Sequence, residues 1–289
     1  MKQITIISGK GGTGKTTIAS NFIKMAHDHI AVDADVDAAN LHILLNPSIE
    51  RKEDFIGSAV AVVDENCINC GKCEELCRFD AISNSIADIK IDSLKCEGCG
   101  VCEYICPASA VNLKKEKQGE FYVSNTSFCK FVHAKLNPGA ENSGLLVTRV
   151  RNLAEDLAYT ENKKLIIIDG APGIGCPVIA SLNGVDYALM VIEPTLSGIS
   201  DFRKVYELAQ FFDIKSFVCI NKFDVNIENT SEIEKFCNSH NIEIIGKISY
   251  DENVPKLLAQ KKFIVDYLDS PAAKDIKKLW EKLEKILFS

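Results

Sequence analysis

The stretch Gly9-Lys10-Gly11-Gly12-Thr13-Gly14-Lys15-Thr16-Thr17 decides the fold of this chain. It follows an apolar run, residues 4–7, that predicts a short buried strand, and it precedes residues 18–23, which predict the start of a helix. A strand, a glycine-rich turn and a helix form the context in which Gly-x-x-x-x-Gly-Lys-Thr predicts a phosphate-binding P-loop. Glycines let backbone N–H groups approach phosphate oxygens closely, and the helix N-terminus adds partial positive charge.

This motif assigns roles to its side chains. Lys15 should reach the β- and γ-phosphates of a nucleotide, and the hydroxyl of Thr16 should bind Mg²⁺. A glycine turn that binds no ligand is the simpler alternative. The residues of the stretch that we expect to bind the nucleotide are Gly11, Gly12, Thr13, Gly14, Lys15, Thr16 and Thr17.

Acidic residues follow two further apolar runs. Residues 30–32 predict a second strand that leads into the acidic segment 33–40, and residues 165–169 predict a buried strand that ends in Asp169. Carboxylates at strand ends beside a P-loop can hold Mg²⁺ or the attacking water, although Asp is also common in turns. We expect Asp169 to support Mg²⁺, directly or through water. We interpret the glycine- and proline-rich residues 170–177 as a switch loop that senses the γ-phosphate.

Later apolar segments continue the same α/β pattern. Asn221-Lys222-Phe223-Asp224 stands at the end of one of these strands, where Asn221 can bond a purine edge. The four residues also match the guanine-recognition motif Asn-Lys-x-Asp, so Asn221 and Asp224 are candidate base ligands and GTP remains an alternative to ATP. We expect the amphipathic final helix to pack on the sheet rather than on a membrane. The predicted strands span residues 187–192, 216–220 and 242–248, and the predicted helices span residues 145–159 and 274–287.

Composition limits the class of protein. The chain has 289 residues, 46% hydrophobic and 25% charged, which is typical of a soluble globular protein of one or two domains. A formal charge of −7 argues against a nucleic-acid-binding surface, which would be basic. The sequence shows neither a targeting leader nor an apolar run of about 18 residues, so we expect a cytoplasmic protein without a membrane anchor.

Eight of the twelve cysteines fall between positions 67 and 106 and form two runs. Each cysteine of the first run recurs 29 positions later, so the segment is an internal repeat. This spacing is typical of the bacterial two-cluster ferredoxins, in which the fourth cysteine of each run binds the other cluster. A zinc site is the alternative, although zinc sites use two separated pairs. The first predicted [4Fe–4S] centre uses Cys67, Cys70, Cys73 and Cys106, and the second uses Cys96, Cys99, Cys102 and Cys77.

These cysteines define an insert in the α/β pattern. We place the insert at residues 58–124 and the P-loop domain at residues 1–57 and 125–289. A polar segment, residues 46–54, leads out of the P-loop domain, and a hairpin of residues 111–113 and 121–123 closes the insert. The predicted fold is a doubly wound, mostly parallel α/β P-loop NTPase with a small inserted α+β domain of the bacterial ferredoxin type.

A second lysine, Lys10, directly follows the first glycine of the P-loop. With this feature the chain resembles the MinD/ParA superfamily of deviant-Walker ATPases, which includes the nitrogenase iron protein and the Mrp-type iron–sulfur carriers. The resemblance covers residues 1–56 and 125–289. It implies that Lys10 reaches across an ATP-dependent homodimer to the partner's nucleotide, that Asp35 orients the attacking water, and that Asn221 contacts adenine. The residues expected to act in catalysis are Lys10, Lys15, Asp35 and Asp169.

The chain more narrowly resembles MinD-like ATPases with an inserted ferredoxin domain, in residues 133–136, 141–144, 173–178 and 193–195. It departs from the Mrp-type carriers, because it has no Cys-x-x-Cys pair outside the insert. Cys176 has the spacing of an interface-cluster ligand of the nitrogenase iron protein, and Cys129 is the candidate second ligand; an ordinary switch-loop role for Cys176 is the alternative. Three other residues are expected in buried, packing or interface roles: Cys219, Cys237 and His133.

Two functions fit these parts. In the first, ATP binding and hydrolysis, with Mg²⁺, drive dimerisation and control electron transfer through two [4Fe–4S] clusters to a redox partner protein. In the second, the protein is an ATP-dependent assembly, carrier or positioning factor, and its clusters are a scaffold or are delivered to an apo-protein. Ligation by interlocked cysteine runs favours retention of the clusters, and therefore electron transfer.

Overall fold

The computed structural model describes residues 1–85, 88–140 and 143–289. Residues 141–142, half of one expected family segment, lie outside the described residues. The chain divides into two compact units. Unit 1 comprises Met1–Lys52, Phe121–Lys135 and Ser143–Ser289, and unit 2 comprises Glu53–Glu120 and Leu136–Asn142.

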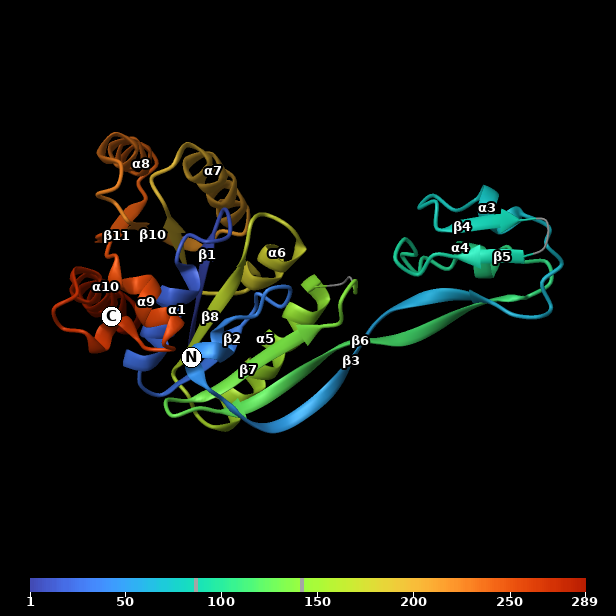
Figure 1. Cartoon of the computed structure of the whole chain (residues 1–289), viewed down its shortest axis with the longest axis horizontal. Coiled ribbons are helices and arrows are strands. Elements are labelled where there is room, and N and C mark those ends of the chain that lie inside the picture. Colours follow the sequence, from blue (N-terminus) through green and yellow to red (C-terminus); the bar gives the residue numbers. More distant parts are fainter. Residues whose placement is uncertain (86–87, 141–142) are drawn as a thin grey trace. The chain divides into compact units, whose positions relative to one another are not determined.

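A mostly parallel sheet runs through unit 1 (Figure 1), and its strand order is β11-β10-β9-β1-β8-β2-β7-β6-β3. All the strand pairs from β11 to β7 are parallel, so the predicted α/β class is confirmed. The strands are β1 (Lys2–Ser8), β2 (His29–Asp33), β3 (Ser48–Val63), β6 (Val111–Asn125), β7 (Lys130–Leu136), β8 (Leu165–Pro172), β9 (Tyr187–Ile192), β10 (Lys215–Asn221) and β11 (Glu243–Ile248).

Helices cover both faces of this sheet, as an all-parallel core requires. The core on one face joins alternate strand residues such as Ile4 and Ile6 to side chains of α1 and α10, where the rings of Phe22 and Trp280 lie 5.1 Å apart. The helices on this face are α1 (Lys15–Met25), α2 (Leu41–Leu45), α9 (Asn253–Ala259) and α10 (Pro271–Phe288), with the short helix η1 (Ile264–Asp266). The helices on the other face are α5 (Ser143–Thr160), α6 (Cys176–Leu182), α7 (Leu196–Phe211) and α8 (Ile227–Ser239).

The final helix packs on the sheet as predicted. Its residues Ile276, Leu279, Leu283 and Leu287 are buried in the core on the α1 face. Among the helices of the described residues, none combines the length and the apolar character needed to cross a bilayer.

The strand order brings three chain segments to one sheet edge. β8 lies between β1 and β2, and all three strands are parallel, so their carboxyl ends meet. In the register of these strands, Asp169 lies opposite Ile6 on one side and opposite Asp33 on the other. The P-loop after β1 and the two acidic strand ends are therefore neighbours, although they are far apart in the sequence.

One expectation for the chain that joins the units is wrong, because the hairpin expected from residues 111–113 and 121–123 is one continuous strand, β6. The polar segment 46–54 leads out of unit 1 as expected, and from Ser48 it does so as strand β3. Both strands are paired in the sheet, so backbone hydrogen bonds outweigh the low strand propensity of their charged residues. Charges also suit β3 as an edge strand, because they discourage pairing with another chain.

Unit 2 repeats its own structure. The short helices α3 (Lys72–Glu75) and α4 (Val101–Tyr104) are 29 residues apart and both follow a glycine with positive φ. In each half a glutamate of the helix accepts a backbone amide: Glu74 from Asn84 at 3.0 Å, and Glu103 from Leu113 at 2.9 Å. A hairpin of β4 (Ile82–Ser85) and β5 (Asp88–Ile91) belongs to the same unit.

The two halves of unit 2 also exchange backbone hydrogen bonds. The amide of Asp64, before the first cysteine run, donates to Ala110 after the second run at 2.8 Å. The amide of Asp92 donates in return to Ala81 at 2.7 Å. Each half therefore closes on the other, and the repeat seen in the sequence is also a repeat in space.

Removal of the buried Leu283 side chain tests the packing of α10. Leu283→Ala leaves a cavity under the helix, so we expect the free energy of unfolding to fall by about 2–5 kcal/mol. The matched control is Leu268→Ala, because Leu268 is 67% exposed and its loss should change stability by less than about 0.5 kcal/mol. Urea unfolding followed by the fluorescence of Trp280, the single tryptophan, measures both. Equal midpoints for the two variants would contradict the packing described here.

Candidate functional site

The P-loop leaves β1 and ends at the N-terminus of α1. Gly12 and Gly14 adopt left-handed φ values of 82° and 89°, and Gly14 is the N-cap of α1. A Cβ atom at Gly14 would lie 2.4 Å from Nδ2 of Asn221, so a side chain has no room there. At Gly11 and Gly12, by contrast, an added Cβ would meet no heavy atom within 4 Å in the described part of the chain. This side of the loop is open to a ligand.

Lys15 is buried beside two carboxylates. Its Nζ donates to Oδ1 of Asp169 at 3.0 Å and lies 3.6 Å from Oδ2 of Asp35. Burial alone would lower the pKa of Lys15, but the charges of Asp169 and Asp35 outweigh it and raise the pKa above its ordinary value. Lys15 is therefore a fixed positive charge at the opening of the P-loop.

A third carboxylate, Asp33, completes this cluster. It accepts the amides of Asp35 at 3.1 Å and Leu41 at 3.2 Å. Burial, followed by the charge of Asp169, raises the pKa of Asp33, and burial likewise raises that of Asp35. The Oδ2 atom of Asp169 is buried and has no hydrogen-bond partner among the described residues.

Three carboxylates around one ammonium group leave an excess of negative charge in a buried site. Carboxylate and hydroxyl oxygens are the ligands that Mg²⁺ prefers, and the free Oδ2 of Asp169 offers one. A divalent cation would balance the excess charge. The Asp169 oxygen, with the hydroxyl of Thr16 and the phosphates of a nucleotide, would make up a donor set that fits Mg²⁺.

Lys10 points away from this cluster. Its Nζ donates to the hydroxyls of Thr195 at 3.0 Å and Ser197 at 3.1 Å. Thr195 is the N-cap of α7, where the helix dipole disfavours a cation. The two hydroxyls therefore hold Lys10 in place.

An apolar cavity of about 220 Å³ opens beside the P-loop. Asn221 lines it and donates from Nδ2 to the carbonyl of Thr13 at 2.8 Å, which joins β10 to the P-loop. The segment after β11 forms the other wall and was not among the predicted binding residues. The one sequence feature that could have indicated it is the polar residues directly after an apolar strand. The residues that line the whole cavity include Ile18, Tyr250, Val254, Pro255, Leu258, Ala272 and Ile276.

Asp224 is not among the residues that line this cavity. Its Oδ1 accepts the backbone amide of Tyr250 at 2.8 Å. Asn221 and Tyr250 therefore line the cavity, and Asp224 is bonded to the backbone of Tyr250.

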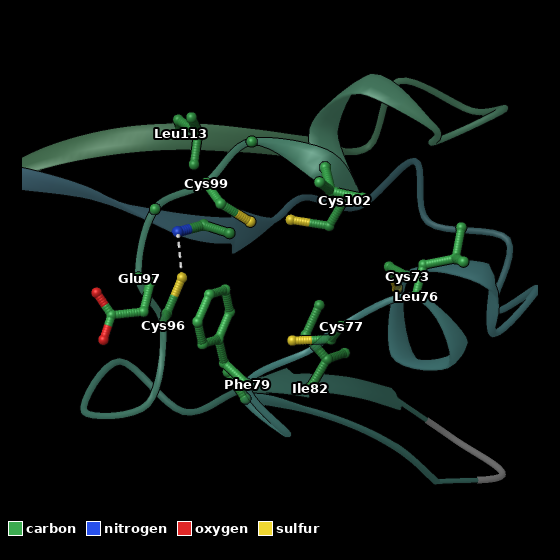
Figure 2. A pocket seen from close by; sticks show the side chains of 15 residues that line it. Cys73, Leu76, Cys77, Phe79, Ile82, Cys96, Glu97, Cys99, Cys102 and Leu113 are labelled. Atoms are coloured by element: carbon green, nitrogen blue, oxygen red, sulfur yellow. Dashed lines mark hydrogen bonds between the residues drawn. The ribbon is translucent and has the colours of Figure 1, made fainter.

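Unit 2 contains a cavity lined by cysteines (Figure 2). The sulfur atoms of Cys77, Cys96, Cys99 and Cys102 point toward the same space, beside the ring of Phe79. These are the four residues that the sequence predicted as one set, with Cys77 contributed by the other half of the repeat. The backbone amide of Ala61 donates to the Cys96 sulfur at 3.4 Å. The remaining lining is mostly apolar, with Leu76, Ile82, Val101 and Leu113, and also includes Cys73.

This arrangement differs from a single-ion site. Among the described residues, no group of three or more His, Cys, Asp or Glu side chains could hold one metal ion. A cubane cluster has one thiolate on each of four irons, so its ligands surround a larger group. The cysteines from both halves and the backbone donor to Cys96 suit such a group, and the space between the side chains has a volume of about 20 Å³ in this structure.

The other singled-out residues have different environments. The pairing of Cys129 with Cys176 is wrong, because Cys129 directly precedes β7 and Cys176 follows β8. Because β7 and β8 run parallel, Cys129 lies at the amino ends of the strands and Cys176 lies at their carboxyl ends. Cys219 and Cys237 are buried, as predicted. The ring of His133 stacks on Phe131 at 4.4 Å, and its Nε2 lies 2.9 Å from Ser124 Oγ, so His133 is a packing residue.

Comparisons with known proteins agree with the geometry of unit 1. Residues 4–264 match the family described as CobQ/CobB/MinD/ParA nucleotide binding domain. The chain is 34% identical over 288 residues to the uncharacterized protein MJ0578 of Methanocaldococcus jannaschii, covering 99% of this chain and 97% of that one. An iron-sulfur cluster carrier protein of Pyrococcus abyssi is 22% identical over 97% of this chain and 85% of its own length.

Among solved structures, the septum site-determining protein MinD of Pyrococcus horikoshii, complexed with Mg-ADP, has a TM-score of 0.60. It is 18% identical and the match covers 99% of this chain and 96% of that one, so this likeness concerns the fold. MinD of Pyrococcus furiosus is similar, with a TM-score of 0.58 and 19% identity over 99% of both chains. The chain belongs to the MinD/ParA family of nucleotide-binding proteins and is an ATP-hydrolysing P-loop ATPase.

Proposed function

We propose that this ATPase couples its nucleotide state to electron transfer through two [4Fe–4S] clusters held in unit 2. The observation that carries the proposal is the single cavity into which Cys77, Cys96, Cys99 and Cys102 direct their sulfurs. The cysteines that line this cavity come from both halves of the repeat, which supports a cluster with ligands from both. ATP hydrolysis is the activity of the family, and its coupling to electron transfer is what we propose.

In this proposal, each residue of the P-loop and its surroundings has a role in ATP hydrolysis. The backbone of residues 11–14 and the hydroxyl of Thr17 would bind the phosphates, and Lys15 would bridge the β- and γ-phosphates once ATP draws it from Asp169. Thr16 and Asp169 would hold Mg²⁺, and Asp35 would orient the attacking water. Asn221 and the apolar cavity would take the base.

The cysteines would hold the clusters as two sets of four. The first set is Cys67, Cys70, Cys73 and Cys106, and the amide of Ala110 donates to the Cys106 sulfur at 3.3 Å. The second set lines the cavity described above. When bound, the clusters would supply one-electron transfer, with potentials set by exposure and by hydrogen bonds to sulfur. The domain that holds them is proposed at residues 58–124, a ferredoxin-like insert.

A continuous chain path supports the coupling. The segment 33–40 contains Asp33 and Asp35, and α2 and β3 follow it directly into unit 2. ATP would close a homodimer through Lys10, whose Nζ lies outside its own carboxylate cluster, and would move residues 170–177. A change of about 60 mV in a one-electron potential corresponds to about 1.4 kcal/mol, which nucleotide binding can supply.

An ATP-dependent cluster carrier is the second candidate. The similarity to the iron-sulfur cluster carrier protein of Pyrococcus abyssi favours it. The absence of a Cys-x-x-Cys pair outside residues 67–106 argues against delivery by the mechanism of the Mrp-type carriers.

Replacement of Asp35 tests the proposed hydrolytic site. Asp35→Ala removes a carboxylate 3.6 Å from Lys15 but no P-loop donor, so ATP should bind and kcat should fall about 100-fold or more. Calorimetry measures binding and phosphate release measures turnover. Asp37→Ala, an exposed neighbour, is the control. Wild-type turnover in the Asp35 variant would contradict the assignment.

Replacement of Cys96 tests the cluster ligands. Cys96→Ser should lose the second cluster, so the iron content of anaerobically purified protein should fall from about eight to about four per chain. Cys176→Ser, at an exposed cysteine of unit 1, should retain the wild-type iron and sulfide content. Zinc in place of iron in the wild-type protein, or equal iron in both variants, would rule out this ligand set.

Midpoint potentials with and without MgATP distinguish the two functions. In the electron-transfer mechanism MgATP shifts at least one cluster potential by about 60 mV or more, and the shift persists while Asp35→Ala holds unhydrolysed ATP. In the carrier mechanism the potentials are unchanged, and iron passes to an apo-ferredoxin only when ATP is present. EPR-monitored titration and iron transfer to apo-ferredoxin measure the two outcomes.

A further inference from the structure

The segment after β11, residues 249–255, is held by carboxylates from other elements. The amide and hydroxyl of Ser249 donate to Oδ2 of Asp275 in α10, at 3.0 and 2.8 Å. The amide of Tyr250 donates to Oδ1 of Asp224, at 2.8 Å. Consecutive residues of this wall are thus tied to α10 and to the turn after β10.

The next residue, Asp251, accepts hydrogen bonds, whereas Ser249 and Tyr250 donate them. Asp251 accepts the amide of Asn253 at 2.9 Å and the hydroxyl of Ser270 at 2.5 Å, and Ser270 is the N-cap of α10. The polar groups of Ser249 and Asp251 are therefore engaged within the protein. All three tied residues line the cavity, and Tyr250, the aromatic one among them, is half exposed, at 52%.

Asp224 reaches the cavity only through Tyr250. The turn that carries Asp224 is joined to the end of β11, because the amide of Phe223 donates to the carbonyl of Ile248 at 3.2 Å. The carboxylate of Asp224 is absent from the lining and one of its oxygens accepts the Tyr250 amide. A carboxylate that recognises guanine must instead present its oxygens to the N–H groups of the base.

The lining also discriminates between the purines. Apart from Thr17, Asn221, Lys222 and the tied residues, much of the cavity wall is apolar, with Val254, Pro255 and Leu258 among its residues. Guanine carries an N2 amino group that adenine lacks. A donor buried against apolar side chains without an acceptor loses affinity, so this wall favours adenine.

We propose that Asp224 is a positioning residue for ATP selectivity. It holds the backbone of Tyr250, so that the ring forms a fixed surface on which adenine stacks, and it does not contact the base itself. Because Tyr250 is already ordered in the folded protein, nucleotide binding does not carry the entropy cost of ordering it, and the affinity is higher. The inference rests on the proposed placement of the base in this cavity.

Calorimetric binding of MgATP, MgGTP and tripolyphosphate tests the proposal. Asp224→Ala should weaken MgATP binding about tenfold and leave tripolyphosphate, which has no base, unchanged. Asp224→Asn should retain near wild-type MgATP affinity, because its amide oxygen can still accept the Tyr250 amide. Asp186→Ala is the matched control, since Asp186 also accepts a backbone amide, that of Gln3 at 2.7 Å, but at the other edge of the sheet. Its binding should be that of the wild type.

A double-mutant cycle tests whether Asp224 affects MgATP binding through Tyr250. Tyr250→Ala should weaken MgATP binding, and adding Asp224→Ala to it should cost little more, because both act through the same ring. Tyr250→Phe should bind as the wild type. Fully additive losses would overturn the positioning role, and so would a loss of GTP binding in Asp224→Asn without any loss of ATP binding.

The controls separate this inference from the placement of the base. If the wild-type protein binds MgATP and tripolyphosphate equally, the base does not use the cavity and both ideas fail. If it prefers MgATP over MgGTP but Asp224→Ala keeps that preference and affinity, the placement stands and only the role of Asp224 is overturned. Unfolding followed by Trp280 fluorescence checks that each variant is folded.

Discussion

The buried charge cluster at the carboxyl edge of the sheet is the constraint on which unit 1 depends. Lys15 can be buried only because Asp169 and Asp35 lie within 4 Å of its ammonium group. These carboxylates arrive from separate strands, so the cluster requires β8 between β1 and β2. Burial raises the pKa of both Asp33 and Asp35, and the neighbouring charge of Asp169 adds to this effect. Binding of a cation and a nucleotide would offset the free-energy cost of burying these carboxylates, which folding alone does not offset.

Unit 2 faces a different physical problem. Its central apolar cluster is small and consists of Cys73, Ile82 and Ile89 with a few partly buried neighbours. Small domains with little core need cross-links or metal centres to be stable. The exchanged hydrogen bonds of Asp64 and Asp92 join the halves, and two clusters with ligands from both halves would join them more strongly. In the proposed function, the groups that carry electrons also stabilise the domain.

Charge is distributed unequally between the two units. The sequence segments of unit 2 contain fourteen acidic and seven basic residues, so unit 2 carries a charge equal to the whole formal charge of −7. A surface of one sign favours encounter with partners of the opposite sign and makes association sensitive to salt. Unit 1 is formally neutral, so the formal charge of the chain comes from the segments of unit 2.

The sequence by itself determined the α/β class, the P-loop, the acidic strand ends and the cysteine repeat, because each is a local pattern with one strong physical interpretation. Only the tertiary structure decided which strands are neighbours, and so it separated Cys129 from Cys176, made residues 111–125 one strand and brought Tyr250 to the cavity beside the P-loop. It also showed that Asp224 accepts the backbone amide of Tyr250. These features depend on pairing between segments distant in sequence, which no local pattern encodes.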